Sequence, residues 1–278
     1  MSSLLGEIQQ RADRAVLLAR KQLAHRFHRR REGLPRVMFV AGVQRSGTNM
    51  LMDALERSSQ TEVFHERDPR AFDNYQLRDI DHIRSLVEES GAETVVLKCL
   101  MESQKLKALL REFPNVTGVW MFRHYTDVVN SMLRSFKNQA AQVMRIAKDR
   151  DADGWLGENM SNETHSIVQN LTCDPIDDPS GAAIQWYFRN LRYFEQGLEN
   201  DSRINLMHYE SLVTEPENEI KWMFEQNQLR FERRITKWIN ARSVGKREPP
   251  AIRSDVKQLC DELYEQLIGA YKLERNAG

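Results

Sequence analysis

Residues 36–58 read "RVMFVAGVQRSGTNMLMDALERS", and they predict a strand, a glycine-framed turn and a helix in succession. The opening apolar run is typical of a strand that is buried on both faces of a parallel sheet. Gly42 and Gly47 frame the turn. A turn in this position presents backbone N–H groups and the positive end of the following helix to an anion. The stretch therefore predicts a phosphate-binding loop at the end of a parallel strand.

Further short apolar runs read as buried strands, and they lie at 93–99, 116–123 and 203–210. Helical stretches separate them, for example "SQKLKALLREF" (103–113) and "TDVVNSMLRSF" (126–136). Alternation of this kind predicts an α/β fold with a central parallel sheet flanked by helices. Together with the glycine turn, it indicates an architecture like that of P-loop-containing nucleotide-binding proteins. We expect residues 34–278 to form one such domain.

The N-terminal segment 1–33 differs from the rest in charge. The chain has 40 basic and 40 acidic residues, so no global field points to nucleic acid. Residues 1–31, however, carry eight Lys or Arg against Glu7 and Asp13. Apolar residues three or four apart over 4–27 predict a helix. It either packs on the core or lies as a basic amphipathic helix on anionic lipid.

The cysteines and the hydropathy of the chain indicate in which cellular compartment the protein is expected. The three cysteines, Cys99, Cys173 and Cys260, are too scattered for a disulfide framework or a zinc cluster, and they favour a reducing compartment. The N-terminus lacks the apolar core of a signal peptide, and no apolar run is long enough for a membrane span. We therefore expect a cytoplasmic protein, with peripheral membrane contact through the N-terminal helix as the open alternative.

The glycine turn departs from the loop of nucleotide-hydrolysing enzymes. That loop reads G-x-x-x-x-G-K-[ST], whereas Thr48 stands here in place of the lysine and the cation has moved to Arg45. A magnesium-dependent phosphoryl enzyme also needs an acidic ligand at a strand end. The later strands end near Lys98 and Arg123 instead. These features predict a transfer without a metal; a P-loop kinase or NTPase with a degenerate loop remains an alternative.

Two signatures carry a resemblance to a known family. "RSGTN" (45–49) is similar to the [KR]-S-G-T-[ST] loop of sulfotransferases that use 3′-phosphoadenosine-5′-phosphosulfate (PAPS), with Asn49 as a departure. "RHYTDVVNS" (123–131) resembles their second signature, in which an Arg at a strand end precedes a Ser by eight residues. The chain most resembles the branch that contains tyrosylprotein sulfotransferases and many bacterial carbohydrate or small-molecule enzymes.

The resemblance implies PAPS as donor and its desulfated form, PAP, as product. "HYESLVTEPENEI" (208–220) resembles a segment that lies near the nucleotide in this branch, and "ARSVGKREPP" (241–250) resembles its late loop. The longer R-K-G-x-x-G-D-W-K loop of cytosolic-type enzymes is absent from the sequence. The implied nucleotide-binding residues are Arg45, Ser46, Gly47, Thr48, Asn49, Arg123, Ser131, Tyr209, Ser243, Gly245 and Lys246.

Catalytic roles follow from the same resemblance. Arg45 and Lys98 would stabilise charge on the leaving phosphate, and a base must remove the acceptor proton. Cytosolic-type enzymes use a histidine two residues after the lysine, but that position is Leu100 here. Glu66 lies 21 residues after Arg45, as the catalytic glutamate does in the tyrosylprotein branch, and it is the predicted base. His65 is the reserve.

The acceptor stays open among a carbohydrate, a lipid and a small molecule, with a hydroxyl or amine receiving the sulfuryl group. Residues 150–182 suggest a polar insertion or mobile segment. The stretch 151–180 holds seven acidic and no basic residues, and it would disfavour polyanionic acceptors if it borders the cleft. A non-catalytic nucleotide-binding protein is the second alternative.

Overall fold

The structure is a computed structural model that describes residues 16–17, 19–21, 23, 25, 33–241 and 244–277. Its centre is a five-stranded sheet in the order β2-β5-β1-β6-β7, in which all pairings are parallel. The strands are β1 (Arg36–Gly42), β2 (Thr61–Phe64), β5 (Thr94–Lys98), β6 (Val116–Phe122) and β7 (Ile204–His208). The predicted α/β fold with a central parallel sheet is confirmed. β1 is the middle strand, so the loop that follows it begins at the centre of the sheet.

Alternate residues of β1 enter two separate cores. Val37, Phe39 and Ala41 belong to one cluster of buried side chains, whereas Met38 and Val40 belong to the other. This alternation follows from the two-residue repeat of a strand, and it explains why the whole run is apolar.

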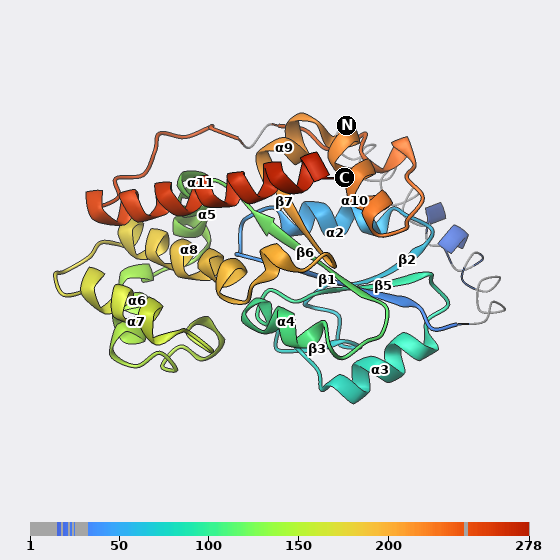
Figure 1. Ribbon diagram of the computed structural model, residues 1–278, viewed down its shortest axis with the longest axis horizontal. Helices are drawn as coiled ribbons and strands as arrows, with labels where there is room; N and C mark the ends of the chain where they lie inside the picture. Colours follow the sequence, from blue (N-terminus) through green and yellow to red (C-terminus); the bar gives the residue numbers. More distant parts are fainter. Residues whose placement is uncertain are drawn as a thin grey trace, which may run out of the picture.

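Helices cover both faces of the sheet (Figure 1). One face carries α2 (Thr48–Glu56), α9 (Tyr209–Thr214) and α10 (Pro216–Gln226). The opposite face carries α3 (Ile80–Glu89), α4 (Leu106–Leu109), α8 (Asp178–Glu195) and α11 (Ser254–Ala277), the last of which also packs beside β7. The carboxyl ends of the five strands are thereby left for the loops that form the site.

Residues 150–182 are helical in large part, so the expectation of a mobile segment is wrong, whereas that of a polar insertion stays a prediction. They contain a 3-10 turn, η2 (Gly154–Leu156), the helix α7 (Asn162–Leu171) and the start of α8. Ser161 and Asp177 accept hydrogen bonds from backbone amides at the starts of α7 and α8. Two polar residues of this stretch therefore serve as helix caps. Together with α5 (Tyr125–Ser135) and α6 (Gln139–Lys148), these helices form a lobe beside the sheet, on the left in Figure 1.

Several shorter elements differ from expectation or were not predicted. The stretch 103–113 forms only a 3-10 turn, η1 (Ser103–Lys105), and α4. Strand β2 was not predicted, because four residues after a helix give too short a pattern to identify. A small hairpin follows it, made of β3 (Phe72–Asp73) and β4 (Gln76–Leu77). Two further 3-10 turns, η3 (Leu198–Asn200) and η4 (Arg233–Ile235), complete the elements.

Most of the predicted N-terminal segment 1–33 lies outside the described residues, so its role stays a prediction. Within it, residues 16–17, 19–21, 23 and 25 are helical. Lys21 is buried, and its ammonium donates a hydrogen bond to the carbonyl of Thr61 on β2, at 2.9 Å. Burial lowers the pKa of Lys21 to about 8. None of the helices in the described part combines the length and the apolar character that crossing a membrane requires.

Candidate active site

The loop between β1 and α2 has the backbone of an anion-binding turn. Arg45 and Gly47 both have positive φ angles, 71° and 94°, so the chain turns sharply before α2 begins at Thr48. No described side chain caps the start of α2. The first amides of a helix have no intrahelical acceptor, and together with the helix dipole they attract a negative group. The backbone therefore matches the predicted phosphate loop.

Two features of this loop fit the phosphate end of a nucleotide. A β-carbon placed on Gly47 would lie 2.2 Å from the ring of Tyr209, so only glycine allows the loop to pack against this ring. The Ser46 hydroxyl is fully buried and has no hydrogen-bond partner among the described residues. A buried polar group without a partner is uncommon and has an energetic cost. Both features suit a loop that closes around a bound group.

The second signature lies on the neighbouring strand end, beside the loop. Arg123 follows β6, is buried, and pairs with Asp127 at 2.8 Å, from Nη2 to Oδ2. Its guanidinium carbon lies 4.3 Å from the centre of the Tyr209 ring. The Trp186 indole donates to the carbonyl of Arg123 at 3.0 Å, which fixes the backbone there. The ion pair and the stacked ring orient the guanidinium before any ligand binds.

Arg45 reaches across to the second signature. Its Nε donates to the Ser131 hydroxyl on α5 at 2.8 Å, although the two residues are 86 positions apart. Ser131 is buried, whereas Arg45 is exposed. The loop arginine therefore lies at the serine that the resemblance assigns to the 3′-phosphate, a contact that the sequence alone does not predict.

The late loop approaches the same place. The Gly245 amide donates to Asp127 Oδ2 at 3.2 Å, and the Asn130 side chain donates to the carbonyl of Glu248 at 3.1 Å. Gly245 is thus brought to the carboxylate that pairs with Arg123. Lys246 is exposed and does not line the cavity, and Ser243 lies outside the described residues.

Lys98, Glu66 and Asn49 form a hydrogen-bonded group at the end of β5. The Lys98 ammonium donates to Glu66 Oε2 at 2.6 Å and to Asn49 Oδ1 at 2.8 Å. The side chains of Lys98 and Glu66 are 7% and 14% exposed, so solvent screens their pairing only in part. The group joins the loop after β2, the end of β5 and the start of α2, and it places the predicted base beside the predicted cation.

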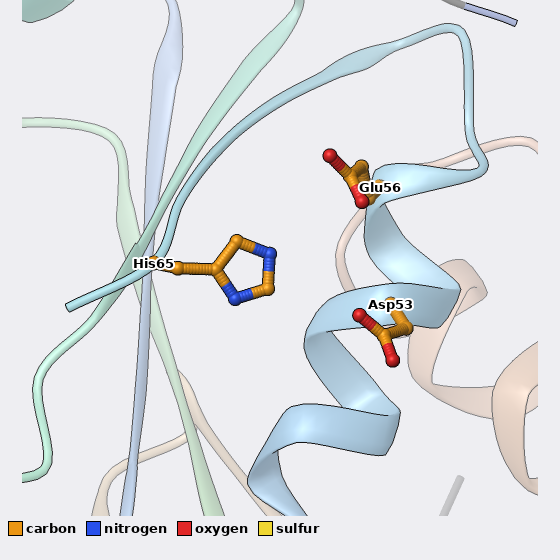
Figure 2. A group of neighbouring side chains, drawn as sticks. All are labelled: Asp53, Glu56 and His65. Atoms are coloured by element: carbon orange, nitrogen blue, oxygen red, sulfur yellow. The ribbon is translucent and has the colours of Figure 1, made fainter. Parts of the chain in front are cut away.

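His65 points elsewhere. Figure 2 shows its ring directed toward α2, between the carboxylates of Asp53 and Glu56. It lines the same cavity as Glu66. The two predicted alternatives for the base therefore occupy different surroundings, and only Glu66 contacts Lys98.

A cavity of about 1020 Å³ collects most of the predicted residues. That volume suits a nucleotide together with a second small molecule. Most of the predicted nucleotide-binding and catalytic residues contribute to its wall. They are Arg45, Gly47, Thr48, Asn49, Glu66, Lys98, Arg123, Ser131 and Tyr209.

One part of the remaining wall is apolar and was missed from the sequence. Leu100, Met101, Tyr75, Phe136 and Trp155 line it, and they come from four separate segments. Tyr75 has a φ of 67° at the tip of the β3–β4 hairpin, a left-handed conformation that is strained for a tyrosine. Trp155 brings the acidic stretch 151–180 to the cavity. The only signal in the sequence was an aromatic residue in a stretch rich in acidic residues.

A buried arginine supports this apolar wall from behind. Arg189 on α8 is 1% exposed and donates to the carbonyl of Leu100 at 2.6 Å and to Gln104 Oε1 at 3.0 Å. Its guanidinium carbon lies 4.6 Å from the centre of the Trp155 ring. Burial lowers the pKa of Arg189 to about 9. The chain immediately after Lys98 is therefore held in place by α8.

Comparisons with known proteins give a likeness in fold. No protein-family model matches the sequence, and no curated protein matches it. The sulfotransferase domain from the curacin biosynthetic pathway is 14% identical, with a TM-score of 0.49 over 84% of this chain and 99% of that one. A sulfotransferase from Alicyclobacillus acidocaldarius is 12% identical, with a TM-score of 0.49 over 87% of this chain and 96% of that one. Mouse sulfotransferase SULT7A1 complexed with PAP is 14% identical, with a TM-score of 0.45 over 86% of this chain and 87% of that one. At these identities and scores, the likenesses assign no activity to this chain.

Proposed function

We propose that this protein is a PAPS-dependent sulfotransferase that transfers a sulfuryl group to a hydroxyl or amine of a small-molecule, carbohydrate or lipid acceptor. One observation carries the proposal. One cavity is lined by residues that come from separate parts of the sequence: Arg45, Lys98, Arg123, Ser131 and Glu66. Arg45 belongs to the first signature, Arg123 and Ser131 belong to the second, and Lys98 stands at the end of a strand.

The two ends of the donor would be held by different parts of the chain. The amides that begin α2, with Thr48 and Asn49, suit the 5′-phosphosulfate because they present N–H and polar groups at a helix start. Arg123 and Ser131, approached by Arg45 and Gly245, suit the 3′-phosphate. A planar guanidinium can make two parallel hydrogen bonds to a phosphate. The Tyr209 ring contacts both Arg123 and Gly47, so it would hold the guanidinium and the loop in fixed positions relative to each other.

Glu66 would act as the general base, and Lys98 would stabilise negative charge during the transfer. Bound PAPS supplies a sulfuryl group on a phosphate that can leave. Glu66 is placed to accept the acceptor's proton, and its carboxylate accepts a hydrogen bond from the ammonium of Lys98. Lys98 also lies beside the start of α2, where negative charge would be stabilised. None of these steps requires a metal ion.

A P-loop kinase or NTPase is the competing function. The described strands that flank β1 end in Lys98 and Phe122, and Arg123 follows the latter. The position in which such enzymes hold magnesium through an aspartate is thus occupied by cations here.

We further propose that the protein is cytoplasmic. Peripheral contact with a membrane through residues 1–33 is a second, independent proposal.

Ligand-dependent thermal stability tests the proposed donor. PAP is expected to raise the melting temperature at concentrations where ATP with magnesium leaves it unchanged, since the stabilisation by a ligand grows with the ratio of its concentration to its Kd for the folded state. Transfer of labelled sulfate from PAPS to a panel of phenols, sugars and amines would then identify the acceptor. A rise with ATP and magnesium alone would contradict the proposal and favour the kinase.

Arg45→Ala is expected to weaken PAP binding about 10–100-fold and to weaken 5′-AMP binding much less, because its side chain lies at Ser131. Calorimetric titration of both nucleotides checks this. Ser131→Ala, combined with Arg45→Ala, should show a non-additive loss of PAP affinity. An equal loss for PAP and 5′-AMP would place Arg45 at the 5′-phosphate instead.

A further inference from the structure

Three potential metal-binding side chains converge on the cavity wall away from the Lys98–Glu66 pair. Asp53 and Glu56 lie on α2 three residues apart, so both face the same side of the helix. His65 follows β2 and points between them (Figure 2). One potential ligand atom from each residue lies within 4.8 Å of those of the other two.

We propose that Asp53, Glu56 and His65 bind a divalent transition-metal ion of the Zn²⁺ or Mn²⁺ type. Ligand atoms around one such ion lie about 2.0–2.2 Å from it, so two of them are separated by about 3–4 Å. The observed spacing reaches this range with small rotations of the side chains. The helix α2, which carries the two carboxylates, packs against β2, the strand that His65 follows. An imidazole beside two carboxylates favours transition metals over Ca²⁺, which takes oxygen ligands.

A metal ion at this site would have to tolerate two positively charged side chains. Lys21 is an electrostatic partner of Glu56, and Arg67 also lines the cavity. The ammonium of Lys21 is committed to the carbonyl of Thr61 at 2.9 Å. The two carboxylates and the imidazole would bind the ion while Lys21 keeps its hydrogen bond to Thr61. Both carboxylates lie on the one helix that starts at the phosphate loop.

The open coordination positions of the site would face the cavity. Three protein ligands leave coordination positions for water or for an oxygen of another molecule, as in open metal sites. Because the three residues line the cavity, those positions would open into it. A metal-bound His65 could not serve as the base, which leaves that role to Glu66. This site does not depend on the identity of the nucleotide.

Titration of untagged, metal-stripped protein with Zn²⁺ alone and Mn²⁺ alone tests the site. The wild type is expected to bind one equivalent of at least one ion. His65→Ala and Asp53→Asn should each weaken that binding at least about tenfold. Asp53 is exposed, so Asp53→Asn reports on the metal even if His65→Ala disturbs the fold.

His82→Ala is the matched control, because it removes an exposed histidine on α3 outside the cluster. Its metal affinity should equal that of the wild type. PAP-dependent stabilisation, measured without added metal, should survive in Asp53→Asn, which separates this site from the donor site. Absence of saturable binding to the wild type, or unchanged affinity in both His65→Ala and Asp53→Asn, would overturn the proposal.

Discussion

Glu66→Gln is expected to lower the rate of sulfuryl transfer by about 10²–10⁴-fold while PAP binding stays intact. Glutamine keeps the size of the side chain and can still accept a hydrogen bond from Lys98, but its amide cannot take a proton from an acceptor. The measurement is transfer from labelled PAPS under single-turnover conditions, alongside a calorimetric titration with PAP.

The control for this variant is Glu62→Gln on the same strand-and-loop segment. Glu62 accepts a hydrogen bond from Ser90 and does not line the cavity, so its loss should leave transfer unchanged. Retention of most activity in Glu66→Gln would move the base elsewhere in the cavity, and His65→Ala would then be the next variant to measure.

Arg123→Ala is expected to weaken PAP binding by about 10²-fold or more and to reduce the preference for PAP over 5′-AMP. The guanidinium is buried, stacked on Tyr209 and paired with Asp127, so it is pre-organised to meet a phosphate. Its loss also leaves Asp127, whose side chain is 12% exposed, without this cation, so the melting temperature should fall as well. Calorimetry and thermal unfolding measure the two effects separately.

Two variants separate ligand binding from folding in this case. Arg123→Lys keeps the charge next to Asp127 but loses the planar fork, so it should recover stability more than PAP affinity. Arg134→Ala removes an exposed arginine from the same helix, α5, and should change neither. Unchanged PAP affinity in Arg123→Ala would remove the 3′-phosphate site from this end of the cavity.

The elements with the clearest patterns could be predicted from the sequence. β1, β5, β6 and β7 are mostly apolar because both faces of each strand are buried, and a run of this kind can be recognised from the sequence alone. The turn at Gly47 and Arg123, which follows a strand, could also be identified from the sequence. Chemistry at the end of a parallel strand depends on residues that are close together in sequence.

Other parts depended on contacts between distant segments. Strand β2 is four residues long, and its pairing with β5 is what makes it a strand. The polar residues near 161 and 177 have the composition of a loop, but they cap α7 and α8. In both cases a local pattern was too short or too ambiguous, and packing against the rest of the chain decided the outcome.

The sequence by itself determined the glycine-framed loop after β1, the parallel α/β fold and most of the polar residues of the candidate site, because each depends on a local pattern or a short spacing. Only the tertiary structure decided which of these residues meet. It placed Arg45 at Ser131, joined Lys98 to Glu66 and Asn49, and gathered Asp53, Glu56 and His65 on one wall. The physical reason is that parallel strands bring their carboxyl ends together in an order that differs from the order of the chain.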